Sequence, residues 1–211
     1  MSALPKPFVT PEQYLEIERK AEYKSEYHSG QVFAMAGASR EHNLLVGSII
    51  RRIGNLLDGR PCETYPSDMR VLVSATGLYT YPDVSVACGE PEFLDGSLDV
   101  LLNPLVIVEV LSSSTESYDR GAKFVLYQRL PSLQEYVLVS QVPQVERYAR
   151  QSDGRWLYQL VEGLEASVTL EALGVTLPLA EIFDRVTFPP DEAGTILPRE
   201  PKEKQTGGHT Q

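Results

Sequence analysis

Helix-start signals and, further along, the helical spacing of apolar residues predict two helices before residue 58 of this chain. Thr10-Pro11-Glu12 supplies an N-cap, a first-turn proline and an acid near the helix dipole, so a helix is predicted from there to about Lys24. Ser39 can cap a second, longer helix that ends before Asp58-Gly59-Arg60-Pro61. The apolar stripe of this second helix, which we expect in the core, consists of Leu45, Ile49, Ile53 and Leu56.

A third helix and several short strands are predicted further along. The helix spans residues 116–130, ends at Pro131, and carries Ala122, Leu126 and Leu130 on one face. A hairpin turning at Ser29-Gly30 is predicted within residues 26–35. Further short strands are expected near residues 63–65, 69–74, 81–88, 105–111 and 136–139, and as a hairpin of residues 145–148 and 156–160.

The remaining segments set the domain boundaries. Residues 89–103 contain glycine, proline and acids and predict an exposed loop, and residues 179–183 predict a last short helix. From Pro189 onward Pro, Glu, Lys, Gly and Gln dominate, which is typical of disorder. The sequence therefore predicts a single domain over residues 1–188 and a disordered C-terminal tail over residues 189–211.

Composition adds modest limits. The 211 residues suffice for one domain with a core, and no apolar stretch is long enough to span a bilayer. The N-terminus lacks an apolar signal core, and Cys62 and Cys88 show neither metal-ligand spacing nor a disulfide framework, so we expect a cytoplasmic protein with reduced thiols. The net charge of −10 does not attract nucleic acid to the whole surface. Two groups stay candidates for a local basic patch: Arg51, Arg52 and Arg60, or Arg120, Lys123 and Arg129.

One carboxylate stands out against this background. Glu109 lies in the middle of Pro104-Leu-Val-Ile-Val-Glu-Val-Leu-Ser112, an apolar run that reads as a strand buried on both faces. A buried carboxylate is costly unless it is paired, hydrogen-bonded or bound to a metal. Asp83, after Pro82 in a strand-like segment, and Lys123, in the helix after Glu109, are candidate partners.

These residue types suit the hydrolysis of a phosphodiester. That reaction needs an activated water and neutralisation of an anionic transition state, and a magnesium ion held by Asp and Glu oxygens supplies both. Asp83 and Glu109 are the candidate metal ligands, with the peptide carbonyl of Val110 as a further oxygen. Lys123 is the candidate group for stabilising charge or placing the water, and Glu26 for an auxiliary acid.

Structural interpretations of the same residues stay open. Asp83 can simply follow a turn, and Glu109 can be a buried acid bridged to a basic residue. Asp119 and Lys123, four apart on a helix, can form a surface ion pair. The other open alternatives are Glu26 pairing with Lys24 or Arg40, and His42 as a hydrogen-bonding or packing residue.

An ordered series of short motifs resembles the Uma family of bacterial restriction-endonuclease-like proteins. The series comprises Tyr81-Pro-Asp-Val, Val108-Glu-Val-Leu-Ser-Ser-Ser-Thr115, Tyr118-Asp-Arg-Gly-Ala-Lys-Phe124 and Pro131-Ser-Leu-Gln-Glu-Tyr136. The resemblance implies the fold of the PD-(D/E)XK superfamily: an α/β domain with a central mixed β-sheet flanked by helices. It also makes Asp83, Glu109 and Glu26 similar to the superfamily's acids. The usual lysine position, two residues after the acid, holds Leu111, which implies that the lysine has moved to Lys123.

The activity implied by this resemblance is a magnesium- or manganese-dependent endonuclease acting on DNA. A homodimer is also expected, because many nucleases of this fold pair their sites to cut both strands. Two alternatives stay open: a non-catalytic nucleic-acid or protein-binding module on a nuclease fold, and a metal-dependent hydrolase of another phosphoester, such as RNA or a nucleotide.

Overall fold

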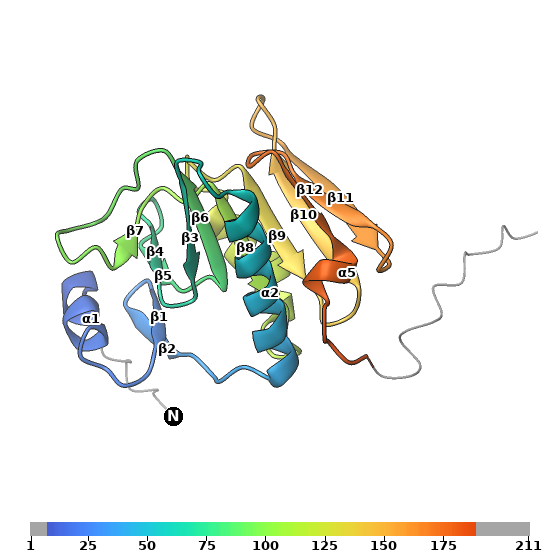
Figure 1. The fold of residues 1–211 in the computed structure, drawn as a ribbon. Helices are drawn as coiled ribbons and strands as arrows, with labels where there is room; N and C mark the ends of the chain where they lie inside the picture. Colours follow the sequence, from blue (N-terminus) through green and yellow to red (C-terminus); the bar gives the residue numbers. More distant parts are fainter. Residues whose placement is uncertain (1–7, 189–211) are drawn as a thin grey trace, which may run out of the picture.

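A computed structural model describes residues 8–188 of the chain (Figure 1). The predicted tail, residues 189–211, lies outside the described residues, so the division into domain and tail stays a prediction. Three β-sheets carry the fold. The central sheet has six strands in the order β11-β10-β9-β8-β6-β3; a five-stranded sheet has the order β2-β1-β5-β4-β7; and β12 pairs with β13.

The central sheet is mixed, as predicted. β8 (Val106–Val110) runs parallel to β9 (Glu135–Val139), whereas its other neighbour, β6 (Val84–Cys88), is antiparallel. The outer strands are β3 (Cys62–Pro66), β10 (Gln144–Arg150) and β11 (Trp156–Glu162), all in antiparallel pairs. Every residue of β8 is buried, which confirms the strand predicted around Glu109.

The smaller sheets are built from short strands. The five-stranded sheet contains β1 (Ser25–His28), β2 (Gln31–Ala34), β4 (Arg70–Val73), β5 (Leu78–Thr80) and β7 (Val100–Leu101). The hairpin of β1 and β2 turns at Ser29 and Gly30, both at positive φ, as the sequence predicted. The hairpin of β12 (Ser167–Leu170) and β13 (Val175–Pro178) was not predicted, and neither was β7 inside the expected loop.

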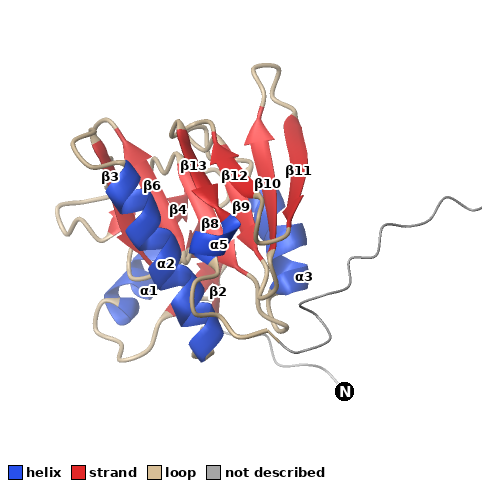
Figure 2. Cartoon of the chain, turned by 45° about the vertical axis from the view of Figure 1, so that its right-hand side comes forward, coloured by secondary structure: helices blue, strands red, loops and turns tan. Residues whose placement is uncertain are grey.

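Helices cover both faces of the central sheet. α2 (Arg40–Leu56), capped by the Ser39 hydroxyl, and α5 (Leu179–Ile182) pack on one face (Figures 1 and 2). Leu45, Ile49 and Ile53 are fully buried there, as predicted. Leu56 is 46% exposed and Leu57 is buried in its place, because the stripe continues to the C-cap. The buried residues of α2 pack in one hydrophobic cluster with side chains from one face of the central sheet. These are Val84, Val86, Val106, Val108, Val110, Val137 and Val139.

The opposite face of the sheet is covered by an irregular helix. The single helix predicted over residues 116–130 consists instead of α3 (Glu116–Tyr118), the π-helical turn η1 (Asp119–Lys123) and α4 (Phe124–Tyr127). A π turn holds an extra residue and shifts the register of the following side chains. The predicted face of Ala122, Leu126 and Leu130 is therefore not kept as one buried stripe: Ala122 is exposed, while Lys123, Phe124, Tyr127 and Leu130 are buried.

α1 (Pro11–Glu18) is shorter than the predicted helix and packs on the five-stranded sheet through Tyr14 and Leu15. None of the helices in residues 8–188 combines the length and apolarity needed to cross a bilayer.

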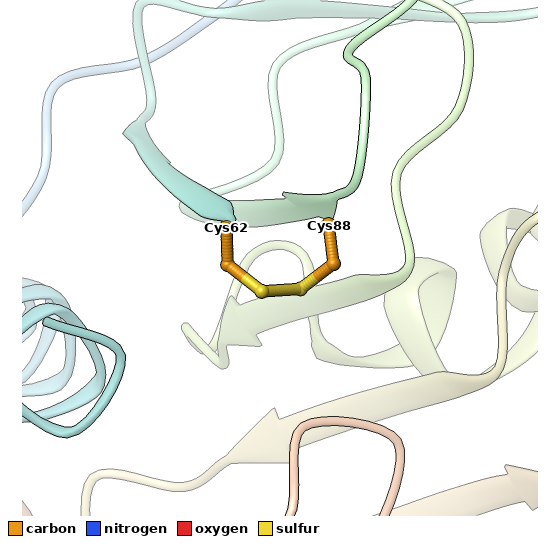
Figure 3. The surroundings of a disulfide bond; sticks show 2 residues. All are labelled: Cys62 and Cys88. Atoms are coloured by element: carbon orange, nitrogen blue, oxygen red, sulfur yellow. A yellow bond between two sulfur atoms is a disulfide. The ribbon is translucent and has the colours of Figure 1, made fainter. Parts of the chain in front are cut away.

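A disulfide joins Cys62 to Cys88, so the prediction that these residues form none was wrong (Figure 3). The antiparallel register of β3 and β6 sets the two cysteines directly opposite each other, with Cα atoms 4.0 Å apart. Their sequence separation of 26 gave no sign of this pairing. The expected cytoplasmic location thereby loses the support of reduced thiols and stays a prediction.

Candidate active site

Antiparallel pairing of β6 with β8 brings the first two predicted residues together. Val84 lies opposite Val108, so Asp83, just before β6, reaches the end of β8. Oδ2 of Asp83 accepts a hydrogen bond from the backbone N–H of Val110 at 2.7 Å. In return the backbone N–H of Asp83 points at Oε2 of Glu109 across 3.4 Å, which is long for a hydrogen bond. The two carboxylates are thus neighbours on adjacent strands.

Lys123 contacts Glu109 from the irregular helix. Its Nζ lies 2.9 Å from Oε1 of Glu109, and both side chains are at most 7% exposed. The phenol of Tyr127, one helical turn on, donates to the same Oε1 at 2.9 Å. Along β8 and the residue that follows it, residues 107, 109 and 111 face the irregular helix, while 106, 108 and 110 face α2. That alternation is why Glu109 meets Lys123.

Glu26 enters from the five-stranded sheet. Its Oε1 lies 3.2 Å from Nζ of Lys123 and accepts a hydrogen bond from the hydroxyl of Thr80. The alternative partners lie elsewhere: Lys24 pairs with Asp68 and Arg40 with Glu41. The structure therefore brings Glu26, Glu109 and Lys123 into direct contact and sets Asp83 beside Glu109.

Asp119 belongs to this cluster, in place of the surface ion pair with Lys123 that the sequence left open. Its Oδ1 lies 3.5 Å from Nζ of Lys123, and its side chain is 4% exposed, so the surface ion pair is excluded. Asp119 and Lys123 lie four positions apart in η1, so their side chains share the side of the helix that is buried. Lys123 is consequently surrounded by three carboxylates, those of Glu26, Glu109 and Asp119.

His42 is the other site residue that the sequence did not assign to the site. Its Nε2 lies 3.1 Å from Oδ2 of Asp83, and the two side chains are 14% and 16% exposed. The helical pattern held a signal for this position, because His42 lies three and seven residues before Leu45 and Ile49 on the buried stripe of α2.

Burial and crowding shift the pKa values of the cluster. Burial raises the pKa of Glu109 to about 8, with Asp119 and Asp83 adding to the rise and Lys123 opposing it. Burial alone would lower the pKa of Lys123, but the surrounding carboxylates raise it well above its ordinary value. Burial likewise raises the pKa of Asp119. For His42, burial has the largest effect and lowers the pKa of the imidazole, but the hydrogen bond to Asp83, the Asp83 charge, the Val110 backbone and Asp119 together raise that pKa above its ordinary value. The site thus holds more carboxyl groups than basic groups, and the raised pKa values of Glu109 and Asp119 favour their protonated forms.

The oxygen donors suit a magnesium ion. Within residues 8–188, no hydrogen-bond partner occupies Oδ1 of Asp83, and Oε2 of Glu109 has only the long contact described above. The β8 register extends to place Pro82 opposite Val110, and proline has no N–H to donate to the Val110 carbonyl. The described residues contain no group of three His, Cys, Asp or Glu side chains arranged around one ion. Two carboxylates with a carbonyl, water and substrate phosphate nevertheless match the usual coordination of magnesium.

Comparisons with known proteins assign the chain to a family. The sequence profile of Uma2, described as "Putative restriction endonuclease", matches residues 11–180. Two uncharacterized proteins of Synechocystis sp., slr1290 and sll1609, are each 38% identical, over 87% and 76% of this chain and 96% and 91% of their own lengths.

A solved structure agrees at the level of the fold. It is the crystal structure of "a putative nuclease belonging to DUF820" from Anabaena variabilis, with a TM-score of 0.69 and 17% identity. The match covers 83% of this chain and 97% of the other. The predicted α/β nuclease fold is thus confirmed, and the chain belongs to the Uma2 family of restriction-endonuclease-like proteins.

Proposed function

We propose that this protein is an endonuclease that uses magnesium or manganese to hydrolyse phosphodiester bonds in DNA. The observation that carries the proposal is the 2.9 Å contact between Lys123 and Glu109, with Asp83 on the adjacent strand. The superfamily's lysine stands two residues after the acid, and here Leu111 holds that position. Lys123 brings an ammonium to the same acid from a different element, which supports a migrated catalytic lysine.

Each residue has a role that follows from its contacts. Asp83 and Glu109 would hold the metal, because the two residues are adjacent and each has an oxygen without a full hydrogen bond, and the Val110 carbonyl would supply a further oxygen. When bound, the ion supplies charge neutralisation and a more acidic water. Lys123, held among carboxylates, would orient the attacking water or stabilise charge on the phosphate. Glu26 would serve as an auxiliary acid that positions Lys123.

The proposed reaction is a simple hydrolysis. The oxygen of water bonds to phosphorus, the bond from phosphorus to the leaving oxygen breaks, and a proton of the water ends on that oxygen. Plasmid nicking tests this reaction directly. We expect conversion of supercoiled DNA to open-circular or linear forms with magnesium or manganese, none with EDTA, and none from Asp83→Asn or Glu109→Gln. Full activity in either variant would reject the assignment.

One observation favours the non-catalytic alternative. Both candidate basic patches are largely neutralised: Arg51 pairs with Asp184, Arg52 with Glu181, and Arg120 with Glu146. Few free cations remain there to hold a phosphate backbone. A binding module would bind DNA equally well without metal and after Asp83→Asn. The other alternative, hydrolysis of RNA or a nucleotide, would show as metal-dependent turnover of those substrates with plasmid left intact.

A homodimer forms part of the proposal, because two copies would be needed to cut opposite strands at one place. Sedimentation equilibrium measures this state. Linear plasmid as an early product would accompany a dimer, whereas a monomer would produce open circles first.

A further inference from the structure

His42 has no role in the proposed reaction, but its contacts indicate a specific one. His42 lies in the first turn of α2, on the same stripe as the core residue Leu45, so its ring is directed toward the sheet. It meets Asp83, 41 positions away, through Nε2 and Oδ2 at 3.1 Å. A carboxylate accepts hydrogen bonds when it is ionised, so the contact is a hydrogen bond in the tautomer in which Nε2 carries the proton and donates it to Oδ2.

Oδ2 of Asp83 therefore accepts two hydrogen bonds, one from His42 and one from the backbone N–H of Val110 at 2.7 Å. Two donors on one oxygen, coming from α2 and from β8, fix the rotation of the carboxylate about its last side-chain bond. Oδ1 is left without a hydrogen-bond partner within residues 8–188. The carboxylate is thus held with one oxygen engaged by the protein and the other one free.

Packing alone does not account for a histidine at this position. Nδ1 of His42 is buried and has no hydrogen-bond partner among the described residues. A buried polar atom without a partner carries a desolvation cost, which an apolar side chain of similar size would avoid. The hydrogen bond from Nε2 to Asp83 is the favourable interaction that offsets this cost at His42.

We infer that His42 is a positioning residue of the metal site: its Nε2–H holds Oδ2 of Asp83, so that Oδ1 of the same carboxylate is presented to the ion. This inference rests on the proposed metal-dependent function. Hydrogen-bond donors behind a metal-binding carboxylate fix its orientation, and their loss typically weakens metal affinity about 10- to 100-fold.

Three variants of the full chain separate the hydrogen bond from packing. His42→Gln keeps an N–H donor at the reach of Nε2, His42→Met keeps the volume without a donor, and Asn43→Ala, in the same helical turn, is the control. Mn²⁺ binding is measured by the electron paramagnetic resonance signal of the free ion, after circular dichroism has confirmed folding. We expect about 10- to 100-fold weaker binding for His42→Met and near-wild-type binding for His42→Gln and Asn43→Ala.

The outcomes are distinguishable. No Mn²⁺ binding by the wild-type protein would reject the proposed function and this inference with it. Wild-type affinity in folded His42→Met would overturn the inference alone, as would equal losses in the Gln and Met variants, which indicate packing. Should His42→Met fail to fold, His42→Asn, whose donor is too short to reach Asp83, replaces it in the comparison with His42→Gln.

Discussion

Nζ of Lys123 lies 2.9 Å from Oε1 of Glu109, and the two residues reach this contact from a π-helical turn and a central strand. Both are buried, and Glu26 and Asp119 crowd around the same ammonium. A buried pair of this kind is weak as a source of stability, because desolvation offsets most of the attraction. The Lys123–Glu109 pair also lies beside Asp83, where the proposed metal site is.

The first prediction concerns metal and thermal stability. A divalent cation held by Asp83 and Glu109 binds only the folded state, so millimolar magnesium or manganese raises the melting temperature. At a concentration 100 times the dissociation constant, the gain is about 2.7 kcal/mol. Glu109→Gln should abolish the response in differential scanning fluorimetry.

Glu135→Gln is the matched control, since Glu135 is a buried acid paired with Arg147 at the opposite end of the parallel β8–β9 pair. It should lower the melting temperature while leaving the metal-induced rise intact. A metal response that survives Glu109→Gln would remove Glu109 from the site.

The second prediction concerns pH in the metal-free protein. The pKa of Glu109 is raised from 4.5 to about 8, so between these values the folded state holds a proton that the unfolded chain has released. Folding stability from this group therefore falls as pH rises through that window. Denaturant unfolding in EDTA should show wild type losing stability relative to Glu109→Gln between pH 5 and pH 8. A constant difference across the window would contradict the raised pKa.

The third prediction concerns Lys123. Lys123→Met removes the cation from the three surrounding carboxylates and should cost about 3–5 kcal/mol in the metal-free protein, the usual loss when one partner of a buried pair is deleted. Plasmid nicking should fall sharply while metal-induced stabilisation persists. Arg52→Ala, which deletes a partly exposed pair with Glu181, should cost about 0–1 kcal/mol. Normal nicking by a folded Lys123→Met would show that Lys123 is structural.

The fourth prediction concerns the disulfide. Cys62 and Cys88 close a loop with a sequence separation of 26, so the double change Cys62→Ser with Cys88→Ser should lower stability by about 2–4 kcal/mol. Asp83 precedes β6 and Cys88 ends it, so the metal response should be unaffected. Two titratable thiols in the untreated native protein would show that the bond does not form.

The fifth prediction concerns residues 189–211. Their composition offers few large apolar side chains to repay the entropy of ordering, so deleting them should leave the melting temperature and nicking nearly unchanged. A drop of several degrees would show that this segment contributes to the domain.

Local patterns in the sequence were enough for most individual elements. Ser39 begins α2, Ser29-Gly30 turns the first hairpin, and the apolar run around Glu109 forms a buried strand, because caps, turns and alternation depend on neighbouring residues. The motif series also pointed to the nuclease fold and to Asp83, Glu109, Lys123 and Glu26 as a group.

Contacts between distant segments could not be inferred in this way. The bond from His42 to Asp83 depends on where α2 crosses the sheet, and the Cys62–Cys88 disulfide depends on the register of β3 against β6. The meeting of Asp119 and Glu26 at Lys123 depends on how the irregular helix packs against the two sheets, and helix propensity gives no sign of the π turn at Asp119–Lys123. Spacing along a chain carries no information on such placement, since it arises only when separate elements pack against one another and bury their side chains together.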